Sequence, residues 1–258
     1  MNDLTDEEDV LHDECGVVGV YLNADPIDTS AMGASSLAYY GMYSLQHRGQ
    51  ESAGIAVSDG SDVKVHKLMG LVADVFKREN LDSLSGRIAV AHVRYATAGG
   101  CTIENAQPMV YRFKLGTVAV AHNGQLVNYE QLREMLEESG SSFNSTSDTE
   151  VIVKFIAKSY KKGLERALTD TIQLIKGSFA LCVMTQDCLI GARDPNGIRP
   201  LCLGKLSGGW VLASESCAID AMGADFVRDI RPGEIVIING DGVLSFEFGE
   251  KTSKRSCI

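Results

Sequence analysis

The feature that most constrains this chain is an acidic leader that runs directly into an apolar segment beginning with a cysteine. Residues 15–21 read Cys-Gly-Val-Val-Gly-Val-Tyr, and this short valine-rich run predicts a buried β-strand. Residues 1–14 contain seven Asp or Glu and almost nothing suited to burial. They are either a frayed tail before an ordinary strand, with Cys15 as a small hydrophobe, or a leader that is cleaved between Glu14 and Cys15.

Cleavage would give Cys15 both a nucleophile and a base. The freed α-amine titrates near pH ~8 and a thiol near ~8.5, so proton exchange between them costs little at neutral pH. Composition alone favours the frayed tail, and the rest of the chain has to distinguish the two interpretations.

Charge and cysteine content exclude several classes of protein. The formal charge of −10 comes mostly from the leader, since the remainder has 27 acidic residues against 24 basic ones. No basic patch suggests a nucleic-acid partner, no apolar run is long enough to span a membrane, and the acidic N-terminus is unlike a signal peptide. Seven scattered cysteines without a CxxC motif predict reduced thiols, a cytoplasmic location and no zinc site.

The pattern of apolar residues predicts a single α+β domain. Strands, a helix, further strands, two helices and a final run of strands follow one another, which fits two sheets with helices on their outer faces. The predicted helices are 30–46, 129–139, a helix opening at Ser147, 164–175 and 217–222, and the predicted strands are 15–21, 53–57, 62–68, 89–92, 119–122, 179–184, 189–193, 201–205, 210–213, 234–238 and 243–248.

Two of these strands share the sequence Ala-Val-Ala-His. The strand at 89–92 leads to Arg94, and the strand at 119–122 leads to Asn123 and Gly124. We expect each to deliver a polar group into a glycine-containing loop at a shared polar pocket. The histidines, His92 and His122, are expected to be hydrogen-bonded core residues, and a Cys–His dyad is the alternative.

Helix-start signals occur twice in the middle of the chain. Asn128 is followed three residues later by a glutamine, and Ser147 is followed three residues later by Glu150, which is the spacing of a capping box. Asp148 at the second start is either a helix-opening carboxylate or part of a site.

Five motifs in chain order give the chain a resemblance to a known family. They are Cys-Gly-Val-Val-Gly-Val at 15–20, Gln-His-Arg-Gly-Gln-Glu-Ser-Ala-Gly-Ile at 46–55, His-Val-Arg-Tyr-Ala-Thr at 92–97, His-Asn-Gly at 122–124 and Ser-Asp-Thr-Glu at 147–150. Together they resemble the class II glutamine amidotransferases. The resemblance implies a four-layer αββα sandwich of the N-terminal-nucleophile hydrolase type, with residues 1–14 as a propeptide and 15–258 as the glutaminase domain.

Motifs in the second half narrow the resemblance. Arg-Asp-Pro-Asn-Gly-Ile-Arg-Pro-Leu at 193–201, Ala-Ser-Glu-Ser at 213–216 and Arg-Pro-Gly-Glu at 231–234 are similar to the amidophosphoribosyltransferase branch, which performs the first committed step of purine biosynthesis. Glucosamine-6-phosphate synthase is the alternative within the family, although it has Arg-Trp-Ala-Thr where this chain has Arg-Tyr-Ala-Thr at 94–97. An unprocessed, non-catalytic glutamine-binding domain is the alternative outside it.

The resemblance also implies a role for each motif residue in hydrolysing glutamine to glutamate and ammonia through a thioester. In this resemblance Cys15 is the nucleophile, and Asn123 and Gly124 form the oxyanion hole. Arg94 binds the α-carboxylate of the substrate, and Asp148 binds its α-ammonium group. Thr97 lies in a loop that closes over the substrate, and Arg48 lies beside the nucleophile in the substrate site.

Further expectations concern the longer protein that the resemblance implies. The phosphoribosyltransferase domain, to which ammonia would pass to turn phosphoribosyl pyrophosphate into 5-phosphoribosylamine, is absent from this chain. Cys257 matches a [4Fe-4S] ligand of one branch, with a plain thiol as the alternative, and its partner ligands would lie beyond Ile258. We expect no cofactor within this chain, a cluster and Mg²⁺ in the full-length enzyme, and a homo-oligomer.

Overall fold

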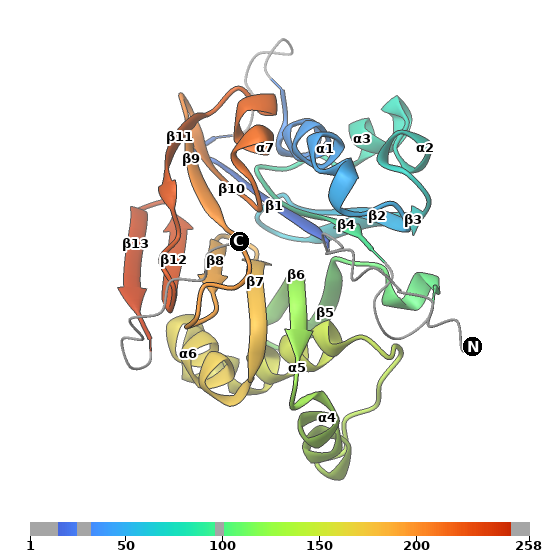
Figure 1. Cartoon of the computed structure of the whole chain (residues 1–258), viewed down its shortest axis with the longest axis vertical. Helices are drawn as coiled ribbons and strands as arrows, with labels where there is room; N and C mark the ends of the chain where they lie inside the picture. Colours follow the sequence, from blue (N-terminus) through green and yellow to red (C-terminus); the bar gives the residue numbers. More distant parts are fainter. Residues whose placement is uncertain (1–14, 25–31, 96–100, 249–258) are drawn as a thin grey trace, which may run out of the picture.

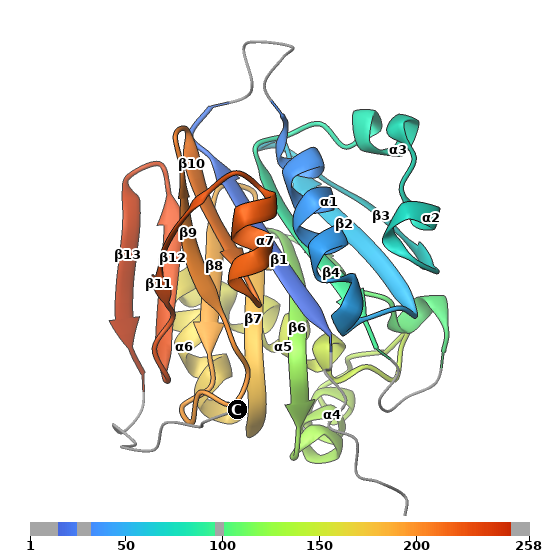
Figure 2. The same cartoon turned by 45° about the horizontal axis from the view of Figure 1, so that its top comes forward.

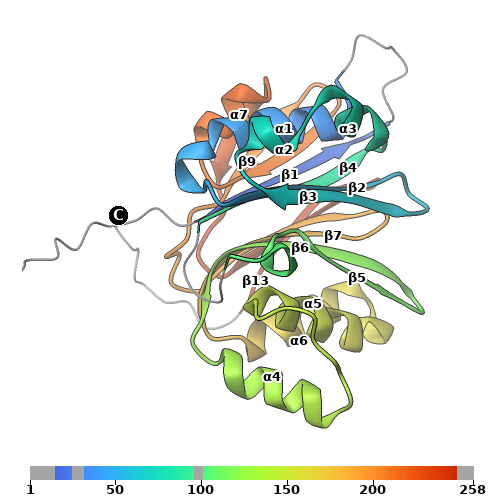
Figure 3. The ribbon, with the colours of Figure 1, turned by 90° about the vertical axis from the view of Figure 1, so that its right-hand side faces the viewer.

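The structure, a computed structural model, describes residues 15–24, 32–95 and 101–248, and its chain forms four layers. Two antiparallel sheets pack face to face, and helices cover the outer face of each (Figures 1 and 3). This arrangement confirms the αββα sandwich predicted from the sequence.

The first sheet has seven strands in the order β11-β9-β10-β1-β4-β2-β3, so β1 lies at its centre. Every residue of β1 is buried, as expected for its valine-rich sequence. The strands are β1 (Gly16–Leu22), β2 (Ser52–Ser58), β3 (Val63–Met69), β4 (Ile88–Arg94), β9 (Cys202–Leu206), β10 (Gly209–Ala213) and β11 (Asp225–Asp229).

The second sheet has six strands in the order β13-β12-β8-β7-β6-β5. Figure 2 shows β6 and β7 passing beneath β1 and β4 of the first sheet. The strands are β5 (Met109–Phe113), β6 (Gly116–Leu126), β7 (Gly177–Met184), β8 (Leu189–Arg193), β12 (Glu234–Asn239) and β13 (Gly242–Glu247).

Helices cover both outer faces (Figure 3). The first sheet carries α1 (Ala34–Ser44), α2 (Val72–Val75), α3 (Arg78–Ser83) and α7 (Ser216–Ala221), and the second carries α4 (Tyr129–Glu138), α5 (Asp148–Ser159) and α6 (Leu164–Leu174). Short 3₁₀ turns η1 (Gln46–Arg48), η2 (Ile103–Asn105) and η3 (Tyr160–Lys162) complete the described elements.

Small residues allow the two sheets to approach closely. Ala56, Ala119, Ala121 and Ala180 lie in the apolar layer between the sheets, together with larger side chains such as Tyr21. Two further apolar layers fill the spaces between each sheet and its helices. The alanines of the thin strand at 119–122 therefore serve the sheet-to-sheet contact, whereas Ala89 and Ala91 of the strand at 89–92 face the helices on the first sheet.

The prediction that Asn123 and Gly124 lie in a loop is wrong, because β6 continues to Leu126. Its neighbour β7 pairs with it along this whole length, with Asn123 opposite Ala180 and Gly124 opposite Phe179. The glycine did not end the strand, since backbone pairing with β7 outweighs its low strand propensity.

Helices begin at both predicted helix-start signals, but the side chains there do not form the hydrogen bonds of the predicted capping boxes. Ser147 caps α5 by accepting the N–H of Thr149, whereas Glu150 reaches back to the N–H groups of residues 144 and 145. Asn128 precedes α4, but its amide binds the backbone at Leu174 and Lys176 instead. It therefore ties α4 to the end of α6.

Candidate active site

Cys15 lies immediately before β1. It is therefore at one end of the first sheet, the sheet that packs against β6. It is 8% exposed, and its φ of 55° makes it the one non-glycine residue with positive φ in the described part of the chain. Its Sγ faces the carbonyl oxygen of Tyr95 at 4.0 Å. Such a backbone conformation is costly for a residue with a Cβ, and contacts that hold it in place are therefore of interest.

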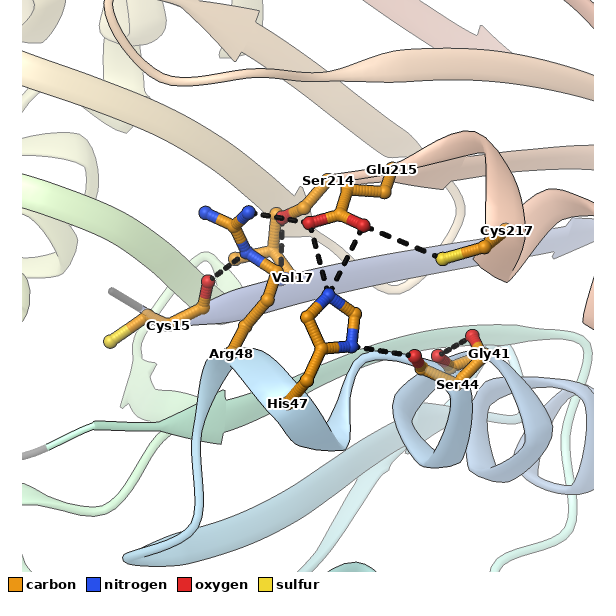
Figure 4. Close-up of polar contacts among 9 residues, drawn as sticks. All are labelled: Cys15, Val17, Gly41, Ser44, His47, Arg48, Ser214, Glu215 and Cys217. Atoms are coloured by element: carbon orange, nitrogen blue, oxygen red, sulfur yellow. Dashed lines mark hydrogen bonds and ion pairs between the residues drawn. The ribbon is translucent and has the colours of Figure 1, made fainter. Parts of the chain in front are cut away.

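Arg48 supplies one such contact. Its Nε donates to the carbonyl oxygen of Cys15 at 2.7 Å, and its Nη1 donates to Glu215 at 2.6 Å (Figure 4). Arg48 thus lies beside Cys15, as predicted. Because its guanidinium holds protein groups here, the geometry supports a role in placing Cys15 more directly than a contact with substrate.

Arg94, the last residue of β4, lies next to Cys15 in the first sheet. Because Gly16 pairs with Val93, Cys15 and Arg94 lie at the same end of the neighbouring strands β1 and β4. Arg94 is buried and forms an ion pair with Glu51, a contact that the sequence analysis did not anticipate. A guanidinium has five N–H donors, so it can bind Glu51 and a substrate carboxylate together.

Asn123 and Gly124 sit on β6 of the facing sheet. Asn123 is fully buried, and neither its Oδ1 nor its Nδ2 has a hydrogen-bond partner among the described residues. Gly124 has a φ of 144°, and a Cβ added there would lie 2.0 Å from the oxygen of Ser178. A buried amide without partners costs about 1–3 kcal/mol, so Asn123 has the character of a ligand-binding residue, whereas the close approach of the β7 backbone accounts for a glycine at position 124.

Asp148 is the first residue of α5 and lies near the end of β6 that carries Asn123 and Gly124. Its carboxylate accepts the N–H of Leu126 at 3.0 Å and lies 3.4 Å from Nδ1 of His122. Burial raises the pKa of Asp148, but the attraction of His122 and the hydrogen bonds from His122, Leu126 and Thr149 outweigh it and leave the pKa below its usual value. The group is therefore an anion at neutral pH, as a clamp for an ammonium group requires.

His92 and His122 are both buried, which confirms the expectation of core histidines. Nε2 of His92 lies 3.0 Å from the carbonyl oxygen of His122, so the ring links β4 to β6 across the sheet interface. Burial lowers the pKa of His92 to about 3, with smaller effects in the same direction from the charges of His122, Arg94 and Lys67. His92 is therefore neutral at physiological pH.

This burial predicts that His92 makes the protein sensitive to acid. Between pH 6.5 and about 3, the unfolded chain binds a proton at His92 that the folded chain does not. The free energy of unfolding should therefore fall by about 1.4 kcal/mol for each pH unit as the pH drops through this range. Above the ordinary pKa of histidine, His92 has no such effect on stability. His92→Gln keeps a donor for His122 and should remove this part of the pH dependence. Urea unfolding of both proteins at pH 7.5, 5.5 and 4.5 measures it, and identical pH slopes would contradict the prediction.

A cavity of about 750 Å³ lies where β6 meets the start of α5. Its described lining includes Gly124 and Asp148, together with Gln125, Leu126 and Thr146. Cys15 and Arg94 lie outside that lining in the described part of the chain. The cavity has room for an amino acid between the predicted ammonium clamp and the predicted oxyanion hole.

Two predicted site residues, Thr97 and Cys257, lie outside the described residues. Within residues 15–24, 32–95 and 101–248, no group of three or more His, Cys, Asp or Glu could hold a metal ion. In the same ranges, no helix is both long and apolar enough to cross a membrane.

Sequence reasoning missed Glu51 and Glu215 as site residues. Both lie within motifs that the sequence analysis quoted, but nothing in their spacing pairs Glu51 with Arg94 or Glu215 with Arg48. Those partners come from different strands and turns, 43 and 167 residues apart in the chain.

Comparison with known proteins gives a consistent picture. Residues 92–221 match the family model of the glutamine amidotransferase domain. The chain is 42% identical over 248 residues to an amidophosphoribosyltransferase of Bacillus subtilis, covering 96% of this chain and 50% of that protein. It is 46% identical over 235 residues to one of Staphylococcus aureus strain MRSA252, covering 90% of this chain and 46% of that protein.

The solved structures agree. The chain superimposes on glutamine phosphoribosylpyrophosphate amidotransferase from B. subtilis, complexed with ADP and GMP, with a TM-score of 0.83 and 42% identity over 91% of this chain and 49% of the other. The chain therefore spans about half the length of the relatives that it matches. The likeness extends to the fold and supports the N-terminal-nucleophile hydrolase type predicted from the sequence.

Proposed function

The chain belongs to the glutamine amidotransferase domain family, and from that premise we propose that it hydrolyses glutamine to glutamate and ammonia with Cys15 as the nucleophile. The observation that carries this proposal is the fully buried Asn123, whose amide has no partner among the described residues. An amide donor beside the N–H of Gly124 is suited to charge that appears only during a reaction.

The proposed reaction begins with removal of residues 1–14, which frees the α-amine of Cys15. The amine takes the thiol proton, and the thiolate adds to the side-chain carboxamide carbon of glutamine. The tetrahedral adduct then collapses, its C–N bond breaks, and the amine returns the proton to the departing ammonia. Water adds to the resulting γ-glutamyl thioester and releases glutamate and the free thiol.

The remaining site residues are proposed to hold the substrate. Asn123 Nδ2 and the N–H of Gly124 would stabilise the oxyanion, Arg94 the α-carboxylate, and Asp148 the α-ammonium. Arg94 comes to this task already oriented by Glu51, which costs less than ordering a flexible side chain on binding. Thr97 is proposed to lie in a loop that closes over the substrate.

The fate of the ammonia is proposed from the relatives. Their identity of 42–46% with amidophosphoribosyltransferases favours transfer to phosphoribosyl pyrophosphate, giving 5-phosphoribosylamine, over the glucosamine-6-phosphate synthase alternative. That transfer needs a phosphoribosyltransferase domain, and we propose that this domain belongs to a longer protein in the cytoplasm. We further propose that the longer protein forms a homo-oligomer and binds Mg²⁺ and a [4Fe-4S] cluster, with Cys257 as one ligand of the cluster. The proposed steps above use only residues of this chain, and none of them is assigned to the cluster.

A glutamate-release assay, with and without phosphoribosyl pyrophosphate, tests the proposed function. We expect slow glutaminase activity that this compound does not change, because every residue assigned above belongs to the ammonia-producing reaction. Absence of glutamate release from protein whose N-terminal mass shows a start at Cys15 would favour a non-catalytic glutamine-binding domain. Clear stimulation by phosphoribosyl pyrophosphate would mean that an acceptor site exists within these residues.

A further inference from the structure

A second group of residues holds the backbone at Cys15 and at the start of β1. Ser214 and Glu215 follow β10 and precede α7, in the Ala-Ser-Glu-Ser motif that the proposed reaction does not use. Figure 4 shows Glu215 between Arg48 and His47, with the carbonyl of Cys15 pointing towards Arg48 and its sulfur pointing away.

Ser214 fastens the first residues of β1. The N–H of Val17 donates to Ser214 Oγ at 3.0 Å, and the N–H of Ser214 donates to the carbonyl oxygen of Val17 at 3.0 Å. Ser214 is fully buried, so both hydrogen bonds are shielded from water. They fix β1 relative to β10 two residues beyond the nucleophile.

Glu215 anchors the arginine that holds Cys15. Its Oε1 accepts from Arg48 Nη1 at 2.6 Å, and its carboxylate also lies 3.2 Å from Nε2 of His47. The Arg48 side chain is only 6% exposed, whereas that of Glu215 is 32% exposed. A cation buried to this degree needs a nearby anion, and Glu215 provides one at the edge of the solvent.

Glu215 keeps its charge under ordinary conditions. Burial raises its pKa, but the hydrogen bond and positive charge of Arg48, together with His47, outweigh burial and leave the pKa below the usual value. The contact with Arg48 is therefore a charge-assisted hydrogen bond, the stronger kind.

We propose that Glu215 is a positioning residue for Cys15 and acts through Arg48, while Ser214 fixes the register of the strand. The argument rests on the proposed role of Cys15 as nucleophile. Arg48 holds the carbonyl of a residue whose φ is 55°, so it fixes the peptide plane from which both the thiol and the α-amine extend. Without Glu215 that plane loses its anchor, and a displacement of about 1 Å at a reacting group can cost roughly 10²-fold in rate.

The test compares Glu215→Ala and Glu215→Gln with the unaltered protein. We expect Glu215→Ala to lower kcat for glutamine hydrolysis about 10- to 100-fold, with KM changed less than about threefold, because Glu215 is not among the described residues that line the proposed substrate cavity. Glu215→Gln keeps an oxygen that can accept from Arg48, so it should recover part of the loss. It also preserves shape and serves if the alanine variant does not fold.

A second measurement does not depend on glutamine. The rate at which iodoacetamide alkylates Cys15, followed by mass spectrometry of its peptide, reports how the thiol is presented. It should fall in Glu215→Ala and recover partly in Glu215→Gln.

Glu234→Gln is the matched control, because it removes the charge of another carboxylate paired with an arginine: Glu234 on β12 is bound by Arg228 at 2.7 and 2.8 Å. It should change the melting temperature but neither kcat nor alkylation. Glu215→Ala with unchanged kcat and alkylation rate would overturn the proposal, as would a raised KM with unchanged kcat. If the unaltered protein released no glutamate, the proposed function would fail, whereas the alkylation comparison would still decide the role of Glu215.

Discussion

Protein that retains one uncleavable residue before Cys15 is expected to fold normally and to release glutamate about 10³-fold more slowly than protein that begins at Cys15. The added residue turns the α-amine into an amide, which cannot accept the thiol proton, and a general base contributes roughly 10²- to 10⁴-fold to such a reaction. His92 is a poor substitute, because its Nε2 contacts the carbonyl oxygen of His122 and burial lowers its pKa to about 3.

The measurement is glutamate release by the two proteins, with their melting temperatures recorded alongside. Cys15→Ala beginning at residue 15 serves as the reference for complete loss of the nucleophile. Activity of the extended protein equal to that of the protein beginning at Cys15 would show that the α-amine is not the base.

Asn123→Ala is expected to lower kcat about 10²- to 10³-fold with little change in KM, which is the usual effect of removing one donor from an oxyanion hole. The donor would act only on the charge of the tetrahedral state, so the binding of glutamine should change far less than the rate. Among the described residues, no hydrogen bond of the Asn123 amide would be lost in this variant.

Asn239→Ala provides the comparison for this variant. It removes an amide of the same size from the hairpin between β12 and β13, where Asn239 accepts the N–H of Asp241. Its kcat should match that of the unaltered protein. An Asn123→Ala protein with a normal kcat, or one in which only KM rises, would remove Asn123 from the proposed oxyanion hole.

The fold could be predicted where apolar periodicity was strong. The valine run of β1 and the strands predicted at 53–57 and 62–68 are confirmed as β1, β2 and β3, and the burial of β1 on both faces is what leaves so clear a local pattern in its sequence. The strands β5 and β11 were missed. Both are short, and β11 is exposed along most of its length, so its residues 225–229 carry little of the apolar signal on which the prediction relied.

The candidate site could be predicted only in part. Cys15 and Asp148 stand out in the sequence because each sits at a recognisable boundary, the end of the acidic leader and the start of α5, but their predicted site roles came from the family resemblance. The partners that hold the site were not found, because Glu51 and Glu215 reach Arg94 and Arg48 only through the folded sheet. The prediction that Asn123 lies in a loop failed because β6 is extended by its pairing with β7, and the sequence of β6 alone does not show that partner.

The most direct test of the central claim is the mass of protein that begins at Cys15, mixed with glutamine and quenched in acid within one turnover. The account predicts one added γ-glutamyl group on the peptide that contains Cys15, formed and lost at rates that match glutamate release, and absent from Cys15→Ala. Glutamate release without any adduct on Cys15, or an adduct on a different residue, would contradict it.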